Sequence, residues 1–304
     1  MRYKQLAAAL LVVCSIVASA VAKEVVVVLD PNVRPYVEAV AGFKQVSNMT
    51  IKVFNRRDDG DLSDERALIA AIRARKPDQI LVLGSEAMTA LAGEITDIPI
   101  LFSMVLSPQD TWKNKPKNLT GVTMSVPPQR QMQVLATLFP DLKFVTSVYS
   151  PDQNTLLLRQ GEEACSALHM KLITAQAGST TEAIVQVEKL LASHEVYWML
   201  PDQLMRSRDV IRYLFFTARE KQKVLIGLSD KYVRAGALFA FTVQNEALGR
   251  QVAALSNRML AEGSRGNYPV EMAHEADLSI NMKVAKNLGI SVPDALLAQA
   301  RVLY

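Results

Sequence analysis

The sequence predicts an α/β protein of two doubly wound lobes, joined by a hinge at which the chain crosses three times. Its 304 residues exceed the needs of one ordinary α/β domain, and we expect two lobes of roughly 130–150 residues each. Strand-like and helix-like segments alternate in two successive stretches, which is typical of parallel sheets with right-handed crossovers. The segment 107–128, rich in proline and lysine, separates the stretches and is interpreted as an excursion between lobes.

The first stretch opens with four valines and a leucine within 24–30, a run typical of a strand that is buried on both faces of a parallel sheet. Pro35 suits the first turn of the following helix, and Ser63 or Asp64 can cap the next one. The other elements expected here are helices at 35–46, 64–75 and 86–93 and strands at 49–54, 79–83 and 98–104.

The second stretch repeats this alternation. We expect helices at 130–138, 154–168, 180–192 and 203–220, with strands at 144–149, 171–175, 196–200 and 224–227. The last part adds strands at 236–243 and 277–281, an amphipathic helix at 245–262, and helices at 282–288 and from 293. With crossings near 122, 235 and 275, the first lobe would hold 23–121 plus 236–274, and the second 122–235 plus 275–304.

The first 22 residues have the pattern of a signal peptide. Arg2 and Lys4 form a short positive region, and an apolar run follows at 6–18. The small-x-small sequence at 20–22 predicts cleavage before Lys23 and therefore a periplasmic or secreted protein. Two alternatives stay open: a retained membrane anchor, for which the run is short, and lipidation at Cys14, which lacks a small residue before it.

Charge and cysteine content argue against several classes of protein. Cleavage would lower the formal charge from +4 to +2, because it removes Arg2 and Lys4. The other basic residues are scattered, and the arginines at 56–57 are followed at once by two aspartates, so no nucleic-acid surface is indicated. Cys165 would be the one cysteine left, so we expect no intrachain disulfide and a buried, unreactive thiol.

The motifs of common enzymes are absent from the sequence. His169, His194 and His274 lie far apart, and none has a second ligand at a metal-binding spacing. The sequence contains no GxxxxGK[ST] phosphate loop, no GxGxxG after the first strand and no GxSxG nucleophile elbow. We therefore expect a binding protein without enzymatic activity, cofactor or metal.

Polar residues follow several predicted strands at their carboxyl ends, the edge at which open α/β sheets bind ligands. These candidates are Ser85, Ser103, the segment 150–155, Asp202-Gln203 and Ser229-Asp230. Several precede predicted helices, so helix capping explains them equally well. The two roles are compatible, because a helix N-terminus offers free N–H groups to a ligand carboxylate.

Several motifs, taken in their order and spacing, resemble one known family. They are LGSEAMTAL at 83–91, DIPILF at 97–102, NLTGVT at 118–123, YSPDQNT at 149–155, GALFAF at 236–241, ALGRQVA at 247–253 and INMKVAKNLGI at 280–290. Together they resemble the ABC transporter substrate-binding family that includes tryptophan- and tyrosine-binding members. The resemblance covers nearly all of the chain after residue 22.

This resemblance implies a type I periplasmic-binding-protein fold, in which two Rossmann-like lobes close on a small ligand such as an amino acid. The binding residues that it implies are Ser85, Glu86, Ser103, Asn154, Thr155, Asp202, Gln203 and Asp230. Asn154 and Thr155 would begin a helix that faces a ligand carboxylate, and Asp202 would face an amino or other polar group. Leu106-Ser107-Pro108 stands where family members often have Thr-Asp-Pro, so ligands other than amino acids stay open.

The function predicted from the sequence is that of an extracytoplasmic receptor of an ABC importer. It would deliver a small-molecule ligand to a membrane permease that is powered by a separate ATPase. The alternative is a periplasmic sensor that presents its closed form to a membrane signalling protein. We expect a monomer. We also expect no nucleic-acid partner, because the signal peptide stands where a transcription factor of related architecture has its DNA-binding helices.

Overall fold

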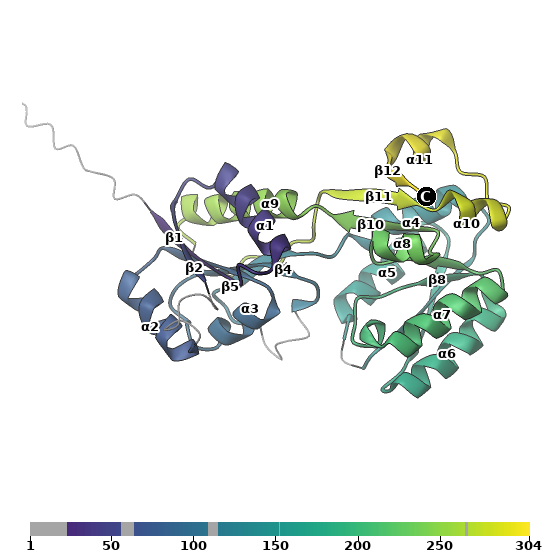
Figure 1. Ribbon diagram of the computed structural model, residues 1–304, viewed down its shortest axis with the longest axis horizontal. Helices are drawn as coiled ribbons and strands as arrows, with labels where there is room; N and C mark the ends of the chain where they lie inside the picture. The colour runs from purple at the N-terminus through teal and green to yellow at the C-terminus, as the bar shows by residue number, and fades with distance from the viewer. Residues whose placement is uncertain (1–22, 56–63, 109–114, 152, 265–266) are drawn as a thin grey trace, which may run out of the picture.

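Two α/β lobes lie side by side in the computed structural model (Figure 1). The structure describes residues 23–55, 64–108, 115–151, 153–264 and 267–304. The predicted signal peptide at 1–22 lies outside these ranges. Within them, no helix combines the length and the apolar character needed to cross a lipid bilayer.

The first lobe is a parallel sheet in the order β2-β1-β3-β4-β5, with helices on both faces. Its strands are β1 (Glu24–Leu29), β2 (Thr50–Asn55), β3 (Gln79–Leu83), β4 (Ile100–Val105) and β5 (Leu119–Thr123). Its helices are α1 (Arg34–Val46), α2 (Glu65–Arg75), α3 (Ser85–Ala92) and, from the late part of the chain, α9 (Asn245–Ala261).

Strand β1 shows how one strand contributes to two cores. Val25 and Val27 pack in the cluster with α1 and α9, whereas Val26 and Val28 pack in the cluster with α2 and α3. All four side chains are fully buried. Successive side chains of a strand point to opposite faces of the sheet, so an unbroken valine run suits a strand that is covered on both faces.

Helix α9 packs along α1, although the two lie some two hundred positions apart in the chain (Figure 1). A Cβ on Gly249 of α9 would lie against the backbone of Ala39 in α1, and a Cβ on Gly42 of α1 would lie against the backbone of Glu246 in α9. The two glycines therefore allow a close approach of the helix backbones, which no larger residue would permit at either position.

The second lobe is a seven-stranded sheet in the order β12-β11-β10-β9-β8-β6-β7. Its strands are β6 (Phe144–Tyr149), β7 (Lys171–Gln176), β8 (Val196–Trp198), β9 (Val224–Ile226), β10 (Phe239–Val243), β11 (Ala276–Ile280) and β12 (Ala300–Leu303). Its helices are α4 (Pro128–Leu138), α5 (Thr155–Ala167), α6 (Thr180–Ser193), the 3-10 helix Leu204–Arg206, α7 (Arg208–Glu220), α8 (Asp230–Ala235), α10 (Met282–Asn287) and α11 (Asp294–Gln299). Only the β10–β11 pair of this sheet is antiparallel.

The second sheet also separates two cores. Val196 and Trp198 of β8 pack in the cluster with α4, α5, α10 and α11, whereas Tyr197 and Met199 pack in the cluster with α6 and α7. The predicted α/β class with two doubly wound lobes is therefore confirmed. In both lobes, successive side chains of a central strand pack into different cores, one on each face of the sheet.

The structure corrects the expected path of the chain in three places. The segment 107–128 is more than an excursion, because it contains the fully buried edge strand β5. Residues 239–243 form β10, which pairs with β9 and β11, so they belong to the second sheet and the crossing lies at 244 rather than near 235. The helix expected from Pro293 ends at Gln299, and β12 follows it and pairs with β11.

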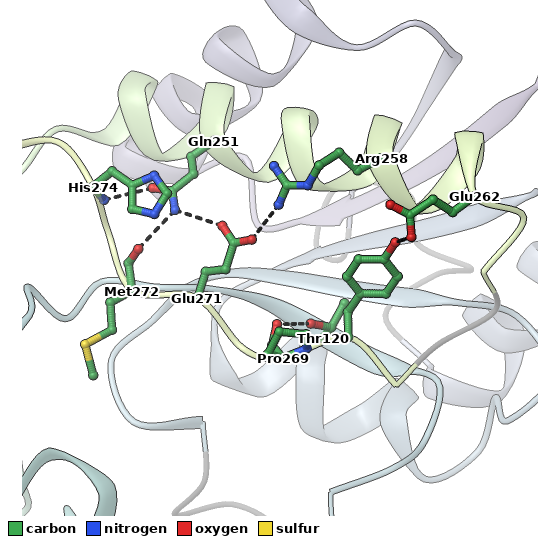
Figure 2. Close-up of polar contacts among 9 residues, drawn as sticks. Thr120, Gln251, Arg258, Glu262, Pro269, Glu271, Met272 and His274 are labelled. Atoms are coloured by element: carbon green, nitrogen blue, oxygen red, sulfur yellow. Dashed lines mark hydrogen bonds and ion pairs between the residues drawn. The ribbon is translucent and has the colours of Figure 1, made fainter. Parts of the chain in front are cut away.

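The third crossing is fixed between the lobes by an extended segment, 269–275 (Figure 2). Glu271 N donates to Gly121 O at 3.0 Å, and Thr123 N donates to Glu271 O at 2.9 Å, so this segment runs beside β5. On its other side, Gln251 of α9 donates from Nε2 to the Glu271 carboxylate and to Met272 O, and its Oε1 accepts from His274 N. The segment therefore belongs to the first lobe up to residue 274.

Candidate ligand-binding site

A cleft of ≈ 1260 Å³ lies between the two lobes and is lined by residues of both. The first lobe contributes Asp30, Tyr36, Ser85, Glu86, Met104 and Leu106, among others. The second lobe contributes Gln131, Gln153, Trp198, Asp202, Gln203 and Tyr232, together with Phe241 and Thr242 of β10. The cleft follows the carboxyl ends of the strands in both sheets, where open α/β sheets bind ligands.

The first lobe presents its topological switch point to this cleft. Strand β1 lies between β2 and β3, and the chain leaves β1 into α1 on one face and β3 into α3 on the other. Asp30 directly follows β1, and Glu86 stands in the first turn of α3. The crevice at such a switch point is where open α/β sheets bind ligands.

Tyr36 of α1 bridges this crevice. Its hydroxyl lies over Gly84, whose φ of 87° and lack of a side chain are both needed at this position. Burial raises the pKa of the Tyr36 hydroxyl, and the negative charges of Glu86 and Asp30 raise it further. The hydroxyl thus lies within the electrostatic field of both carboxylates. Asp30 itself accepts from Asn32 N at 3.0 Å, which fixes the turn after β1.

A bulge in β4 supplies a further side chain to the cleft. The pairing of β4 with β5 shifts register between Phe102 and Val105, and Met104 within this bulge has a φ of 59°. A non-glycine residue in the left-handed region is uncommon and is found disproportionately at functional sites. Here the unusual backbone accompanies a side chain that lines the cleft.

The switch point of the second sheet lies between β6 and β8, and Asp202 spans it. One carboxylate oxygen accepts from Ser150 N, after β6, at 3.0 Å, and the other accepts from Leu204 N at 2.9 Å. Burial raises the pKa of Asp202, and its hydrogen bonds with Ser150, Leu204 and Met205 oppose that shift. Asp202 thus binds the first N–H of the 3-10 helix and also lines the cleft.

The side chains of Trp198 and Gln131 form the adjoining part of the cleft wall. The indole N–H of Trp198 donates to Gln131 Oε1 at 2.9 Å, and both residues line the cleft. Gln203, next to Asp202, donates from its backbone N–H to Gln153 Oε1 at 3.2 Å. The position of Trp198 within a strand predicts a core residue, and it is indeed 1% exposed, but it also reaches the cleft surface.

Four of the eight predicted site residues line the cleft and four do not. Ser85, Glu86, Asp202 and Gln203 lie along it, and their contact with a ligand remains a prediction. The other four lie elsewhere. Ser103 is fully buried within β4. Asp230 stands next to the cleft-lining Ser229, but its carboxylate binds Arg234 and Tyr304. Thr155 is exposed outside the cleft lining.

Asn154, the fourth, lies at a separate small cavity. This cavity of ≈ 210 Å³ is next to the hinge and is lined by Lys115, Asn154, Gln160 and Met272, among others. The small cavity adjoins the main cleft, because Leu106, Ser107, Ser125 and Leu157 line both. Contact of Asn154 and Thr155 with a ligand carboxylate therefore stays a prediction. Tyr36, Tyr232 and Phe241 line the cleft but were not expected from the sequence.

Two doubly wound lobes with a ligand-sized cleft between them define a solute-binding protein of the type I periplasmic-binding-protein fold. The chain belongs to the ABC transporter substrate binding protein family, whose model matches residues 38–303.

Relatives and solved structures agree with this assignment at low identity. The chain is similar to a tyrosine-binding protein of Clostridioides difficile (strain R20291), with 21% identity over 86% of this chain and 77% of the relative. It also matches a ligand-free, open substrate-binding protein from Clostridium difficile with a TM-score of 0.67 and 19% identity, over 93% of this chain and 99% of that one. An ABC domain from Streptococcus pneumonia in complex with L-Trp gives a TM-score of 0.62 and 19% identity, over 93% and 100% of the two chains. At these identities the structural matches show the fold.

Proposed function

We propose that this protein is the extracytoplasmic receptor of an ABC importer, which captures a small organic molecule between its lobes and passes it unchanged to a membrane permease. The observation that carries the proposal is that one cleft brings together the switch points of both sheets, with Asp30 and Glu86 on one side and Asp202 on the other. A ligand that contacts both sides binds the closed form more tightly than the open one.

Closure follows from this difference in affinity. A ligand shifts the open–closed equilibrium only as far as it binds the closed state better, and contacts from both lobes supply that difference. The three crossings, near 124–127, at 244 and at 274–275, are the connections about which the lobes would rotate. The closed form would present a surface to the permease that the open form lacks.

The location and the ligand class rest on other evidence. The signal-peptide pattern at 1–22 supports export, and the names of the tyrosine-binding relative and of the L-Trp complex make aromatic amino acids the first compounds to test. We propose that the mature chain starts at Lys23, acts as a monomer, and performs no chemistry on its ligand.

A ligand screen combined with a measurement of shape tests the proposal. Purified chain starting at Lys23 would be melted with amino acids, amines, nucleosides, sugars and organic acids. A compound at 100 times its Kd stabilises the native state by about 2.7 kcal/mol. Each hit would then be examined by small-angle X-ray scattering, where the radius of gyration should fall on binding. Hits that bind without any change in shape, or that the protein converts to a product, would contradict the proposed receptor.

A further inference from the structure

The three crossings between the lobes run next to one another and meet at the start of α4. Ala273 N donates to Ser125 O at 3.0 Å, which places the first crossing beside the third. Val243 pairs with Ala276 in the antiparallel β10–β11 pair, which places the second crossing beside the third as well. Helix α4 begins at Pro128, directly after the first crossing. Two neighbouring side chains of its first turn contact the chain at or next to each crossing.

Arg130 is the first of these two side chains, and it joins the third crossing to an aromatic ring of the cleft. Its guanidinium donates from Nη1 to His274 O at 2.9 Å and from Nη2 to Ala276 O at 3.4 Å. The same group lies over the ring of Phe241, with Cζ 4.8 Å from the ring centroid, and a ring face attracts a cation in this position. Phe241 lies in β10, which leads into the second crossing, and it lines the cleft. Arg130 therefore binds hinge backbone and a cleft-lining ring at the same time.

Gln131 makes the corresponding link at the first crossing. Its Nε2 donates to Val126 O at 3.3 Å, and its Oε1 accepts the indole N–H of Trp198 at 2.9 Å. The indole also packs against α5, where a Cβ on Gly161 would lie 2.6 Å from Cζ3 of the ring. A ring packed this closely cannot shift unless its partners shift with it. The amide of Gln131 thus connects the wall of the cleft to hinge backbone, as the guanidinium of Arg130 does.

These contacts give a physical route from the cleft to the hinge. Packed side chains and hydrogen-bonded backbone have discrete arrangements, because groups in a dense interior do not move independently. A ligand that packs against Phe241 or Trp198 favours the arrangement of the ring that it contacts. The polar partners of both rings hold carbonyl oxygens of the first and third crossings, so the favoured arrangement includes the hinge.

We infer that Arg130 and Gln131 are positioning residues that couple the cleft to the hinge. They restrict the relative orientation of the lobes, and they do so together with the cleft-lining rings of Phe241 and Trp198. Arg130, which is not among the described residues of the cleft lining, acts on a ligand through the Phe241 ring. This inference rests on the proposed receptor function and names the residues through which binding reaches the hinge.

The relative orientation of the lobes can be measured without a ligand. Spin labels at Gln45→Cys in α1 and Lys189→Cys in α6, both exposed positions, report the distance from one lobe to the other by pulsed electron resonance. The chain starts at Lys23 and carries Cys165→Ala, so the two introduced residues are its only cysteines. The width of the distance distribution then shows how strongly the hinge restricts the lobes.

Arg130→Met removes the charge and both donors but keeps a long, unbranched side chain. We expect a broader distribution of distances between the lobes than in the parent chain. Arg130→Lys keeps the charge but lacks the planar fork that reaches two carbonyl oxygens, so it should broaden the distribution less. It takes the place of Arg130→Met if that variant does not fold. Arg212→Met, an exposed position on α7 outside the described cleft lining, is the matched control and should leave the distribution unchanged.

Gln131→Glu separates the two contacts of that side chain. The carboxylate still accepts the indole N–H of Trp198 but cannot donate to Val126 O. We expect a broader distribution from this variant as well, because the link to the first crossing is lost while the indole keeps its acceptor. Gln133→Glu is the matched control, at an exposed position of the same helix, and should have no effect. Equal distributions in the two variants would overturn the role of Gln131.

Phe241→Leu tests whether the ring and the guanidinium act as one unit. It removes the aromatic face over which Arg130 lies and keeps an apolar side chain. Alone it should broaden the distribution, and in the Arg130→Met background it should add little, because substitutions within one unit are not additive. Fully additive broadening would show that the two groups act separately, and would overturn the coupling.

Ligand titration completes the test. L-tryptophan, L-tyrosine and any compound found in the wider screen should shift the distance distribution of the parent chain, and should bind Arg130→Met about tenfold more weakly with a smaller shift. A lower melting temperature of Arg130→Met with the distribution of the parent chain would overturn the inference, because it indicates a structural role alone. A parent chain that binds no compound, or binds without a shift, contradicts the receptor function, whereas the measurements without ligand still decide whether these residues restrict the lobes.

Discussion

Gln251 and Arg130 hold one hinge residue, His274, from opposite lobes. Gln251 of α9 accepts the His274 N–H through Oε1 at 2.9 Å, and Arg130 of α4 donates from Nη1 to His274 O at 2.9 Å. Helix α9 packs on the first lobe and α4 on the second. The third crossing is therefore held from both lobes at the backbone of His274.

Removal of the Gln251 amide should loosen this crossing. Gln251→Leu leaves Met272 O and the His274 N–H without their side-chain partner, and it removes one hydrogen bond to the Glu271 carboxylate. We expect the free energy of unfolding to fall by about 1–3 kcal/mol, and the His274 amide to exchange faster with deuterium. Urea denaturation and hydrogen exchange followed by mass spectrometry would measure the two effects.

Gln133→Leu serves as the control for this substitution. Gln133 is an exposed glutamine within α4, so the same chemical change is made in a helix but away from the hinge. Its unfolding free energy should change by no more than about 0.5 kcal/mol. Equal losses in the two variants would show that the bonds of Gln251 do not stabilise the hinge.

The contact between α1 and α9 provides a second prediction, on which helix propensity and packing disagree. Alanine is about 1 kcal/mol better than glycine within a helix, so propensity alone favours Gly249→Ala. The new Cβ would meet the backbone of Ala39, and overpacking of this kind costs about 1–3 kcal/mol or more, because backbone cannot rotate away as a side chain can. We expect a net loss of stability and a lower melting temperature.

Gly93→Ala is the matched control for Gly249→Ala. Gly93 ends α3 with right-handed helical backbone, at a φ of −85°, and a Cβ there would have nothing within 4 Å. This variant should be neutral or slightly more stable in the same melting experiment. A Gly249→Ala protein as stable as Gly93→Ala would mean that α1 and α9 can separate without loss.

Most of the fold could be predicted from the sequence, because its central strands carry strong local signals. The strands Gln79–Leu83 and Phe144–Tyr149 have the bounds that the sequence predicts. The missed strands are short and lie at or near sheet edges. Leu119–Thr123 follows a proline-rich segment, and Ala300–Leu303 continues a pattern that looks helical. Pairing with neighbouring strands decides such segments, and a local pattern cannot report it.

The candidate site could be predicted only where it follows strand ends. Ser85 and Glu86 come shortly after β3, Asp202 and Gln203 come shortly after β8, and all four line the cleft. Tyr36 and Tyr232 stand on helices, where an aromatic residue has no distinguishing sequence signal. The position of Thr155 could not be predicted, because the direction in which the first turn of α5 faces depends on the packing of that helix against the second sheet.

The buried thiol of Cys165 should be inert in the native protein. Cys165 is fully buried in α5, and burial, with a smaller effect of the Glu162 charge, raises its pKa from 9.0 to about 11. We expect negligible reaction with a disulfide reagent at pH 8 and full reaction in denaturant, measured in a Cys14→Ser background because the sequence has a second cysteine at position 14. Rapid labelling of the folded protein would contradict the burial of this side chain.

The same shift predicts how stability depends on pH in the alkaline range. A group with a raised pKa in the folded state contributes stability that is complete below the unfolded value, near 9, and is lost as the pH rises through the folded value, about 11. The loss amounts to about 2–3 kcal/mol. Cys165→Ala removes this titration, so denaturant unfolding between pH 8 and 11 should show a shallower decline in the variant than in the parent chain. Parallel declines would contradict the predicted shift.

Asp202 allows a prediction with the sign opposite to that of an ordinary carboxylate. Because burial raises its pKa, the protonated form is favoured in the folded state more than in the unfolded one. The stability associated with that proton is complete below the unfolded value, about 3.9, and is lost as the pH rises through the folded value.

Asp202→Asn keeps an acceptor for one of the two backbone N–H groups and removes the charge. The stability of Asp202→Asn relative to the parent chain should therefore improve between pH 4 and pH 7, as measured by urea unfolding at both values. Asp202→Ala, which leaves both Ser150 N and Leu204 N unpaired, should be less stable than Asp202→Asn at both pH values by about 1–3 kcal/mol. A relative stability of Asp202→Asn that instead worsens with rising pH would show that the hydrogen bonds of Asp202 outweigh its burial, and that its carboxylate is a net stabilising charge at the switch point.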